Sequence, residues 1–470
     1  MILKILSFDK NSEMKNLLIV SILFSQITFS QSVSDNLDKL VKEIMSEPNA
    51  LSANLSFYVS DENGNLVYEY NGNKGLSTAS TQKIFTSAAA LETLGKDYQF
   101  KTTASYSGKI ANGTLDGDFY ITSNGDPTLG SWRYEDYKPE KFKQKLLEAI
   151  RKSGIKKITG NLIVDDSYFD FQSTPGGWPW NDLGNYYGAG TFGVNWKENQ
   201  FDININGNQV KGYSYDLDNV NWINDLKTGG SSDQSLIFTA PHSETALING
   251  TLPAGKVTTV SGATPNPPMQ LAVEIKKLLE ENGIAVSGKT TTYYNEKVAG
   301  KSVSKTPNQN QIFEYKSPTL DKIVYWLMRK SINLYAETLI KTMAKEKRNN
   351  PSFETGVDFL KDFWKSKGIN PNMINFADGS GLSPQNYVSA KAQVQALLYS
   401  KKQNWFDAFY EGFPTQNGIK MKSGTIKDSK SFAGYQTSKN GKNYVFSIIL
   451  NNYQGGNISN ALFKVLDNLK

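Results

Sequence analysis

The most restrictive feature of this sequence is how its residue pattern changes along 470 residues. Near the start, alternating apolar residues on either side of Asn63-Gly64 predict a β-hairpin over residues 54–70. An apolar helix is predicted over Thr81–Leu94, with Gly95 as its stop. From about 98 to 265 the pattern changes to short strands between Gly- and Asn-rich turns, and helices and strands return afterwards. This order predicts one α/β (α+β) domain, built from both chain ends and interrupted by a large β-rich insert.

We expect the domain to contain residues 32–97 and 312–470, and the insert to contain residues 98–311. The insert is expected to be one module or two subdomains, one nested in the other. The other elements expected after residue 265 are helices over Met269–Asn282, Leu320–Lys345, Phe353–Lys367 and Ser459–Leu469, and strands over Gly418–Lys427, Ser431–Thr437 and Tyr444–Leu450.

The first 31 residues have the pattern of a secretion signal. Met14-Lys15 precedes the short apolar run Leu17–Phe24, and the small residues Thr28 and Ser30 stand where a signal peptidase would cut. Residues 1–13 look like an upstream extension. The run is short for a membrane span of about 20 residues, although an uncleaved anchor is the alternative. We therefore expect a protein that is secreted across the inner membrane into the periplasm, and that is soluble or peripheral.

The chain has no Cys and a single His, His242. These counts exclude a thiol nucleophile, a disulfide framework, a Cys-ligated metal centre and a two-His metal site. A Ser-His-Asp triad would have to include His242. We expect no metal and no cofactor. The net charge of +6 is mild and no Lys/Arg block occurs, so we expect no nucleic-acid partner.

The segment Gly283-Ile-Ala-Val-Ser-Gly-Lys-Thr290 matches the phosphate-loop pattern letter for letter. A phosphate loop needs a strand before it and a helix after it, so that the helix N-terminus faces the phosphates. Here the predicted helix comes first and a strand-like run follows. We therefore expect a helix cap and a turn, and no nucleotide binding.

Three short motifs contain hydroxyl and amine groups that could carry chemistry. Ser80-Thr-Gln-Lys83 opens the apolar helix, and its spacing puts both end side chains on one face. Ser331-Ile-Asn333 interrupts an apolar helical region, which indicates either a helix break or buried hydrogen-bonding groups. Lys422-Ser-Gly-Thr425 lies on a predicted strand and, taken alone, is also typical of an exposed edge strand with a Gly bulge. In this order the three motifs form the penicillin-recognising serine acyltransferase set.

With these motifs the chain resembles the class C low-molecular-mass penicillin-binding proteins of the penicillin-binding protein 4 type. These are D-alanyl-D-alanine carboxypeptidases that also act as endopeptidases. The resemblance covers nearly the whole chain after the signal segment, and it implies a serine β-lactamase/transpeptidase-like domain. It also implies peptidoglycan stem peptides as substrates and β-lactam antibiotics as inhibitors. Other matching segments are Gly125–Leu129, Gly160–Ser167, Trp178–Asp182, Tyr186–Ala189 and Asp378–Ser383. One departure is Ser423, where Thr is commoner.

The resemblance implies Ser80 as the nucleophile and Lys83 as its general base. A lysine can act as a base if its pKa falls to about 7–8, through burial or a second cation such as Lys422. Ser331 would relay a proton to the leaving amine, and Asn333 would hold the substrate amide and orient Lys83. The implied substrate-binding residues are Ser423, Gly424 and Thr425 on the strand, and Asp182 and Tyr187 in the insert, the last two for a side-chain amine of the stem peptide.

Three other readings stay open. A serine β-lactamase shares the acylation chemistry, but the chain shows no second Glu motif of the class A kind. A non-catalytic peptidoglycan-binding protein on the same fold would not need every motif hydroxyl and lysine. A glycan-binding module could describe the insert alone. We interpret the acidic residues Glu337, Asp378 and Asp166 as structural.

Overall fold

The structure is a computed structural model that describes residues 33–214, 217, 220–302, 310–455 and 457–470. The predicted secretion signal at residues 1–31 lies outside the described residues. None of the helices in the described ranges is long and apolar enough to cross a membrane.

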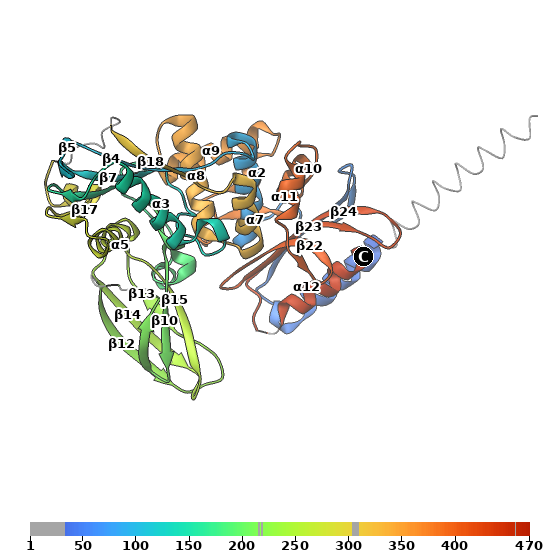
Figure 1. The fold of residues 1–470 in the computed structure, drawn as a ribbon. Helices are drawn as coiled ribbons and strands as arrows, with labels where there is room; N and C mark the ends of the chain where they lie inside the picture. Colours follow the sequence, from blue (N-terminus) through green and yellow to red (C-terminus); the bar gives the residue numbers. More distant parts are fainter. Residues whose placement is uncertain (1–32, 215–216, 218–219, 303–309, 456) are drawn as a thin grey trace, which may run out of the picture.

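A six-stranded antiparallel sheet joins the two ends of the chain, with strand order β2-β1-β24-β23-β22-β21 (Figure 1). The predicted hairpin is confirmed as β1 (Asn54–Asp61) and β2 (Leu66–Tyr70). Strand β1 pairs with β24 (Asn443–Asn451) along its whole length, so the N-terminal hairpin completes a sheet that the C-terminal strands build. The remaining strands are β21 (Thr415–Gln416), β22 (Ile419–Ile426) and β23 (Ser429–Thr437).

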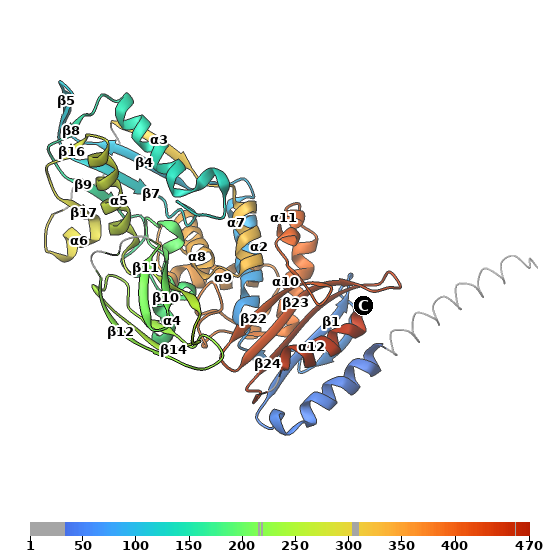
Figure 2. The same cartoon turned by 60° about the horizontal axis from the view of Figure 1, so that its bottom comes forward.

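Both faces of this sheet are covered, which explains why β24 is buried over Tyr444–Leu450. Phe446 and Ile448 face a helix over residues 33–46 and helix α12 (Ile458–Leu466), which lie side by side in Figures 1 and 2. Val445 and Ile449 face the helical side of the domain. The alternation follows from the two-residue period of a strand.

The helical side holds the largest core of the molecule. Its members are α2 (Lys83–Leu94), α7 (Leu320–Lys330), α8 (Asn333–Arg348), α9 (Phe353–Ser366), α10 (Ala390–Lys401) and α11 (Phe406–Glu411). Helix α2 packs against α7, α8, α9 and α10, so it lies at the centre of the group. A small sheet of β3 (Gly75–Leu76), β19 (Ile374–Asn375) and β20 (Tyr387–Ser389) lies beside it.

The helical stretch expected over Leu320–Lys345 is divided into α7 and α8, which confirms the helix break that was one of the two alternatives at Ser331-Ile-Asn333. Ser331 has a left-handed φ of 59° and ends α7, and α8 restarts at Asn333. Such a residue turns the chain and cannot continue a right-handed helix. The break places Ser331 and the first turn of α8 beside the sheet edge.

The insert begins with a five-stranded sheet of order β17-β9-β7-β4-β18. Its strands are β4 (Lys101–Tyr106), β7 (Phe119–Ser123), β9 (Leu162–Asp165), β17 (Thr290–Thr292) and β18 (Gln311–Lys316). A four-stranded sheet of β5 (Lys109–Ala111), β6 (Thr114–Asp116), β8 (Lys157–Ile158) and β16 (Ala285–Val286) adjoins it. Helices α3 (Pro139–Lys152) and α5 (Pro267–Glu281) contribute to the same core.

A separate lobe with its own apolar core is nested in the insert and projects from it in Figure 1. It consists of two three-stranded sheets. Their strands are β10 (Gln200–Asn206), β11 (Gln209–Tyr213) and β15 (Val257–Ala263), and β12 (Asn221–Thr228), β13 (Leu236–Phe238) and β14 (Thr245–Leu252).

Two expectations for the insert need correction. Helix α3 was not expected, although Phe142, Leu146 and Ile150 recur at helical spacing and are buried. Strand β18 pairs with β4, so residues 312–316 join the insert's sheet and not the domain to which the sequence boundary assigned them. In the phosphate-loop look-alike, α5 comes first and β17 follows, which is the order expected from the sequence.

Candidate active site

Ser80 and Lys83 lie where a short helix, η2 (Ala79–Gln82), passes into α2. The Lys83 Nζ donates a hydrogen bond of 3.0 Å to the Ser80 Oγ. Lys83 is fully buried, and this burial lowers its pKa from 10.5 to about 7. A neutral lysine amine at this distance can accept the proton of a serine hydroxyl.

The backbone around Ser80 is held tightly against the sheet. Ala79 has a left-handed φ of 47°, a backbone conformation that residues other than Gly rarely adopt. A Cβ at Gly424 would lie 2.3 Å from the Thr78 carbonyl oxygen and 2.9 Å from the Ser80 nitrogen. Only glycine therefore lets β22 approach η2 so closely. The strand that carries Lys422 lies directly against the serine.

Asn333, the first residue of α8, links Lys83 to the insert. Its Oδ1 accepts a 2.5 Å hydrogen bond from the Lys83 Nζ, and its Nδ2 donates a 2.7 Å hydrogen bond to the Tyr187 carbonyl oxygen. The second bond fixes the amide so that its oxygen faces the lysine. The insert thereby orients a side chain that contacts Lys83.

Lys422 and Ser331 form a second pair beside the first. The Lys422 Nζ donates to the Ser331 Oγ at 2.9 Å and to the Ser423 carbonyl oxygen at 2.8 Å. Burial, and next to it the charge of Lys83, hold the pKa of Lys422 well below its usual range. From the sequence we expect Lys422 to lower the pKa of Lys83. Burial is the largest cause of the lowered pKa of Lys83, and the charge of Lys83 contributes to the lowered pKa of Lys422.

A glycine-rich loop closes the site from the other side and was not assigned a role from the sequence. The Ser380 carbonyl oxygen accepts a 2.8 Å hydrogen bond from the Lys83 Nζ. Asp378 shapes this loop by accepting from the backbone nitrogens of Gly381 and Ser383, both at 2.7 Å. The Asp-Gly-Ser-Gly pattern indicates a glycine-rich loop, but it does not indicate that this loop contacts Lys83.

Two acidic side chains near this loop oppose the lowering of the Lys83 pKa. Asp378 and Glu337 both raise the pKa of the lysine, against the larger effect of burial. Burial, followed by the charge of Asp378, raises the pKa of Glu337 to about 8. Glu337 also accepts a 3.0 Å hydrogen bond from the Gly379 nitrogen. Asp378 and Glu337 thus hold the loop in place, which agrees with their interpretation as structural residues.

A cavity of about 770 Å³ opens over Ser80. It is lined by Ser80, Asp182, Tyr187, Ser331, Asn333 and Thr425, among others. The Tyr187 hydroxyl donates to the Asp182 carboxylate at 3.3 Å, and partial burial raises the pKa of that carboxyl. Four of the expected residues are absent from this lining: Lys83, Lys422, Ser423 and Gly424. The Ser423 hydroxyl accepts a hydrogen bond from Gln416.

His242 lines a different cavity, in the insert. Within the described ranges no group of three or more His, Cys, Asp or Glu side chains could hold a metal ion. The Ser80 hydroxyl instead has a lysine beside it. Fold and site together are those of a serine-type hydrolase in which a lysine lies beside the serine.

The family model described as "D-Ala-D-Ala carboxypeptidase 3 (S13) family" matches residues 37–418. The chain belongs to this family, and the resemblance that the motifs indicated is confirmed. The match contains Ser80, Lys83, Ser331 and Asn333 and ends just before Lys422.

Known relatives agree over most of the chain. D-alanyl-D-alanine carboxypeptidase DacB of Haemophilus influenzae is 28% identical, over 94% of this chain and 92% of the relative. D-alanyl-D-alanine carboxypeptidase of Actinomadura sp. is 25% identical, over 84% of this chain and 77% of its own. The crystal structure of penicillin-binding protein 4 from H. influenzae superposes with a TM-score of 0.76 and 25% identity, covering 92% of this chain and 98% of that one. The expected fold class is therefore confirmed.

Proposed function

We propose that this protein is a penicillin-binding serine D-alanyl-D-alanine carboxypeptidase and endopeptidase that acts on peptidoglycan stem peptides. The observation that carries the proposal is the Ser80–Lys83 pair, with its 3.0 Å hydrogen bond and a lysine pKa near 7. Family membership supports the same reaction class. The predicted signal supports action in the periplasm.

In the proposed mechanism the neutral Lys83 amine takes the Ser80 proton while the hydroxyl attacks the carbonyl between the two D-alanines. Backbone N–H groups of Ser80 and Thr425 hold the oxyanion, an interaction worth about 3–4 kcal/mol per donor. Ser331, which accepts a 2.9 Å hydrogen bond from Lys422, relays the proton that Lys83 took to the nitrogen of the leaving D-alanine, so that Lys83 is neutral again. Water then hydrolyses the acyl-enzyme and restores Ser80.

Lys422 also supplies positive charge for the terminal carboxylate of the substrate, together with the Thr425 hydroxyl and the backbone at Gly424. The hydroxyls of both Ser423 and Thr425 already accept a hydrogen bond, from Gln416 at 3.0 Å and from Lys430 at 2.8 Å. In this proposal the domain built from both chain ends holds the reacting groups, and the insert flanks the cavity. The nested lobe projects from the insert.

The test is intact-mass analysis after brief exposure to benzylpenicillin, beside Ser80→Ala. A one-to-one adduct that maps to the Ser80 peptide and is absent from the variant is expected. A persistent adduct supports a penicillin-binding protein, whereas rapid turnover of the drug would instead support the serine β-lactamase reading. No adduct and no turnover would overturn the proposal and favour a non-catalytic binding protein.

We further propose that Asp182 and Tyr187 recognise the side-chain amine of the diamino acid in the stem peptide. Both line the cavity over Ser80, and a carboxylate beside an aromatic ring suits an ammonium group. Asp182→Ala is expected to raise KM about tenfold for peptides with a free amine, because about 1.4 kcal/mol of binding is lost. Peptides whose amine is acetylated are the matched control and should show no change. Equal effects on both peptides would refute this assignment.

A further inference from the structure

A second cavity, of about 480 Å³, lies in the insert and shares no lining residue with the cavity over Ser80. It is formed where the nested lobe meets the start of α5 and helix α6 (Tyr293–Val298). Its volume is in the range of small-molecule sites, about 300–1,000 Å³. The lining residues that matter here are Phe171, His242, Glu244, Asn266, Asn295 and Val298.

One wall of this cavity is an aromatic ring in a fixed orientation. Phe171 is 47% exposed, yet its ring is stacked on His242 with centroids 4.5 Å apart and 12° between planes. Tyr294 packs edge-on against the same ring at 5.3 Å. His242 itself has a left-handed φ of 62° and a buried Nε2 without a partner among the described residues. A large apolar face is thus held open at a cavity wall, where the C–H face of a sugar ring can pack.

Polar groups face the same space. The Asn266 Nδ2 donates to the Asn295 Oδ1 at 3.2 Å, which orients the second amide. The Asn295 Nδ2 and the Glu244 carboxylate have no hydrogen-bond partner in the part of the chain that the structure describes. An amide donor and a carboxylate acceptor can together bind hydroxyl and acetamido groups.

Charged side chains are fewer at this cavity than at the one over Ser80. Among the described lining residues, Glu244 is the only charged one. The cavity over Ser80 is lined by Lys330 and Lys427 and also by Asp182 and Asp428. The described lining of the second cavity therefore offers a ligand mainly apolar and neutral polar groups.

We propose that the second cavity binds the N-acetylated glycan strand of the peptidoglycan from which the stem peptide projects. The identity of the polymer rests on the proposed function; the chemistry of the ligand, a neutral sugar with acetamido groups, rests on the cavity itself.

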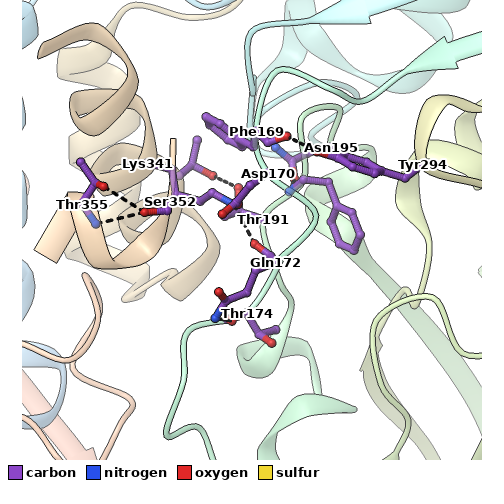
Figure 3. Close-up of polar contacts among 12 residues, drawn as sticks. Phe169, Asp170, Gln172, Thr174, Thr191, Asn195, Tyr294, Lys341, Ser352 and Thr355 are labelled. Atoms are coloured by element: carbon purple, nitrogen blue, oxygen red, sulfur yellow. Dashed lines mark hydrogen bonds and ion pairs between the residues drawn. The ribbon is translucent and has the colours of Figure 1, made fainter. Parts of the chain in front are cut away.

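The segment that carries Phe171 is also tied to the catalytic helix. Figure 3 shows Lys341 of α8 reaching Asp170 and the Gln172 carbonyl oxygen, at 2.6 and 2.7 Å. Lys341 follows Asn333 by eight residues, which is about 12 Å along α8. Both neighbours of Phe171 in the sequence are thus anchored on the helix that begins at the active site. A glycan bound here would lie within reach of a stem peptide in the cavity over Ser80.

The test measures binding of the full protein to peptide-free glycan strands and to an N-acetylglucosamine tetramer by calorimetry. Phe171→Ala removes the ring, and Val298→Trp fills the cavity from a position that is 74% exposed. Each variant is expected to weaken glycan binding by about tenfold or more, while the penicillin adduct and turnover of short D-Ala-D-Ala peptides stay unchanged. Trp132→Ala, which removes another exposed ring of the insert, is the matched control and should bind as the wild type does.

The outcomes separate this proposal from the proposed function. Absence of glycan binding by the wild type, or wild-type binding by both cavity variants, overturns the glycan site even if Ser80 is acylated. Glycan binding that the cavity variants lose, in a protein that penicillin does not acylate, supports the glycan site and overturns the enzyme. Equal weakening by Trp132→Ala also overturns the assignment to this cavity.

Discussion

In the proposed mechanism, the ionisation of Lys83 decides when Ser80 can react. Its three donor contacts, to Ser80, Asn333 and Ser380, orient the amine. Its burial makes the ammonium form costly, so that the pKa is about 7. Below that pH the amine is protonated and cannot act as a base; above it the amine is free.

We therefore expect the rate of acylation by benzylpenicillin to rise with pH through about 7 and to level off above it. Stopped-flow measurement of adduct formation between about pH 5 and 9 checks this, and the thermal midpoint over the same range controls for unfolding. A rate that still rises steeply at the upper limit would mean that Lys83 keeps an ordinary pKa and is not the base.

Each motif residue of the site could be predicted from the sequence. The contacts that hold these residues in place could not. Ser80 and Lys83 are three residues apart, so helical spacing alone brings them together. The Trp178 Nε1 donates to the Asp378 carboxylate at 2.9 Å across 200 positions of sequence. No local pattern indicates such a contact, and so only the structure shows that the loop that carries Ser380 lies against Lys83. The roles of the motif residues stay predictions.

The break between α7 and α8 shows how an element can be decided by tertiary structure. Periodic apolar residues predicted a helical stretch through this region, with Ser331-Ile-Asn333 as either a break or buried hydrogen-bonding groups, and both halves are helical. The left-handed backbone of Ser331 ends α7, and its hydroxyl accepts a 2.9 Å hydrogen bond from the Lys422 Nζ on a nearby strand. Helix α3 is the opposite case. The helical spacing of its apolar residues is present in the sequence, but the strand and turn patterns on either side favoured a β-rich prediction.

Two substitutions at Ser331 separate its backbone role from its hydroxyl. Ser331→Gly removes the left-handed strain and Ser331→Ala retains it, so we expect the Gly variant to be more stable than the Ala variant by about 1 kcal/mol. Both variants lack the hydroxyl and should release D-alanine at least tenfold more slowly, as a loss of about 1.4 kcal/mol in the transition state implies. Urea unfolding and D-alanine release measure the two effects. Equal stability would contradict the strain at Ser331, and retained activity in either variant would contradict proton relay by its hydroxyl.

Polar contacts join the insert to the domain that is built from both chain ends. Asn333 binds the Tyr187 carbonyl oxygen at the active site, and Trp178 binds Asp378 behind it. Further along α8, Lys341 has a fully buried side chain that pairs with Asp170 (Figure 3). A buried ammonium depends on its partner, since removing the partner leaves an uncompensated charge.

Asp170→Asn is therefore expected to destabilise the protein by about 2 kcal/mol, less than for a fully buried pair because Asp170 is 36% exposed. Adding Lys341→Met to this variant should restore part of the loss, because no buried charge is then left unpaired and an apolar side chain suits the rings of Phe169 and Phe353. Glu62→Gln, in the exposed pair with Lys401, is the matched control and should cost less than about 1 kcal/mol. Urea unfolding measures all three variants, and the penicillin adduct at Ser80 should persist in each because none of these residues contacts it. A loss in Asp170→Asn no larger than in the control, or no recovery in the double variant, would mean that the Lys341–Asp170 pair does not hold the insert to α8.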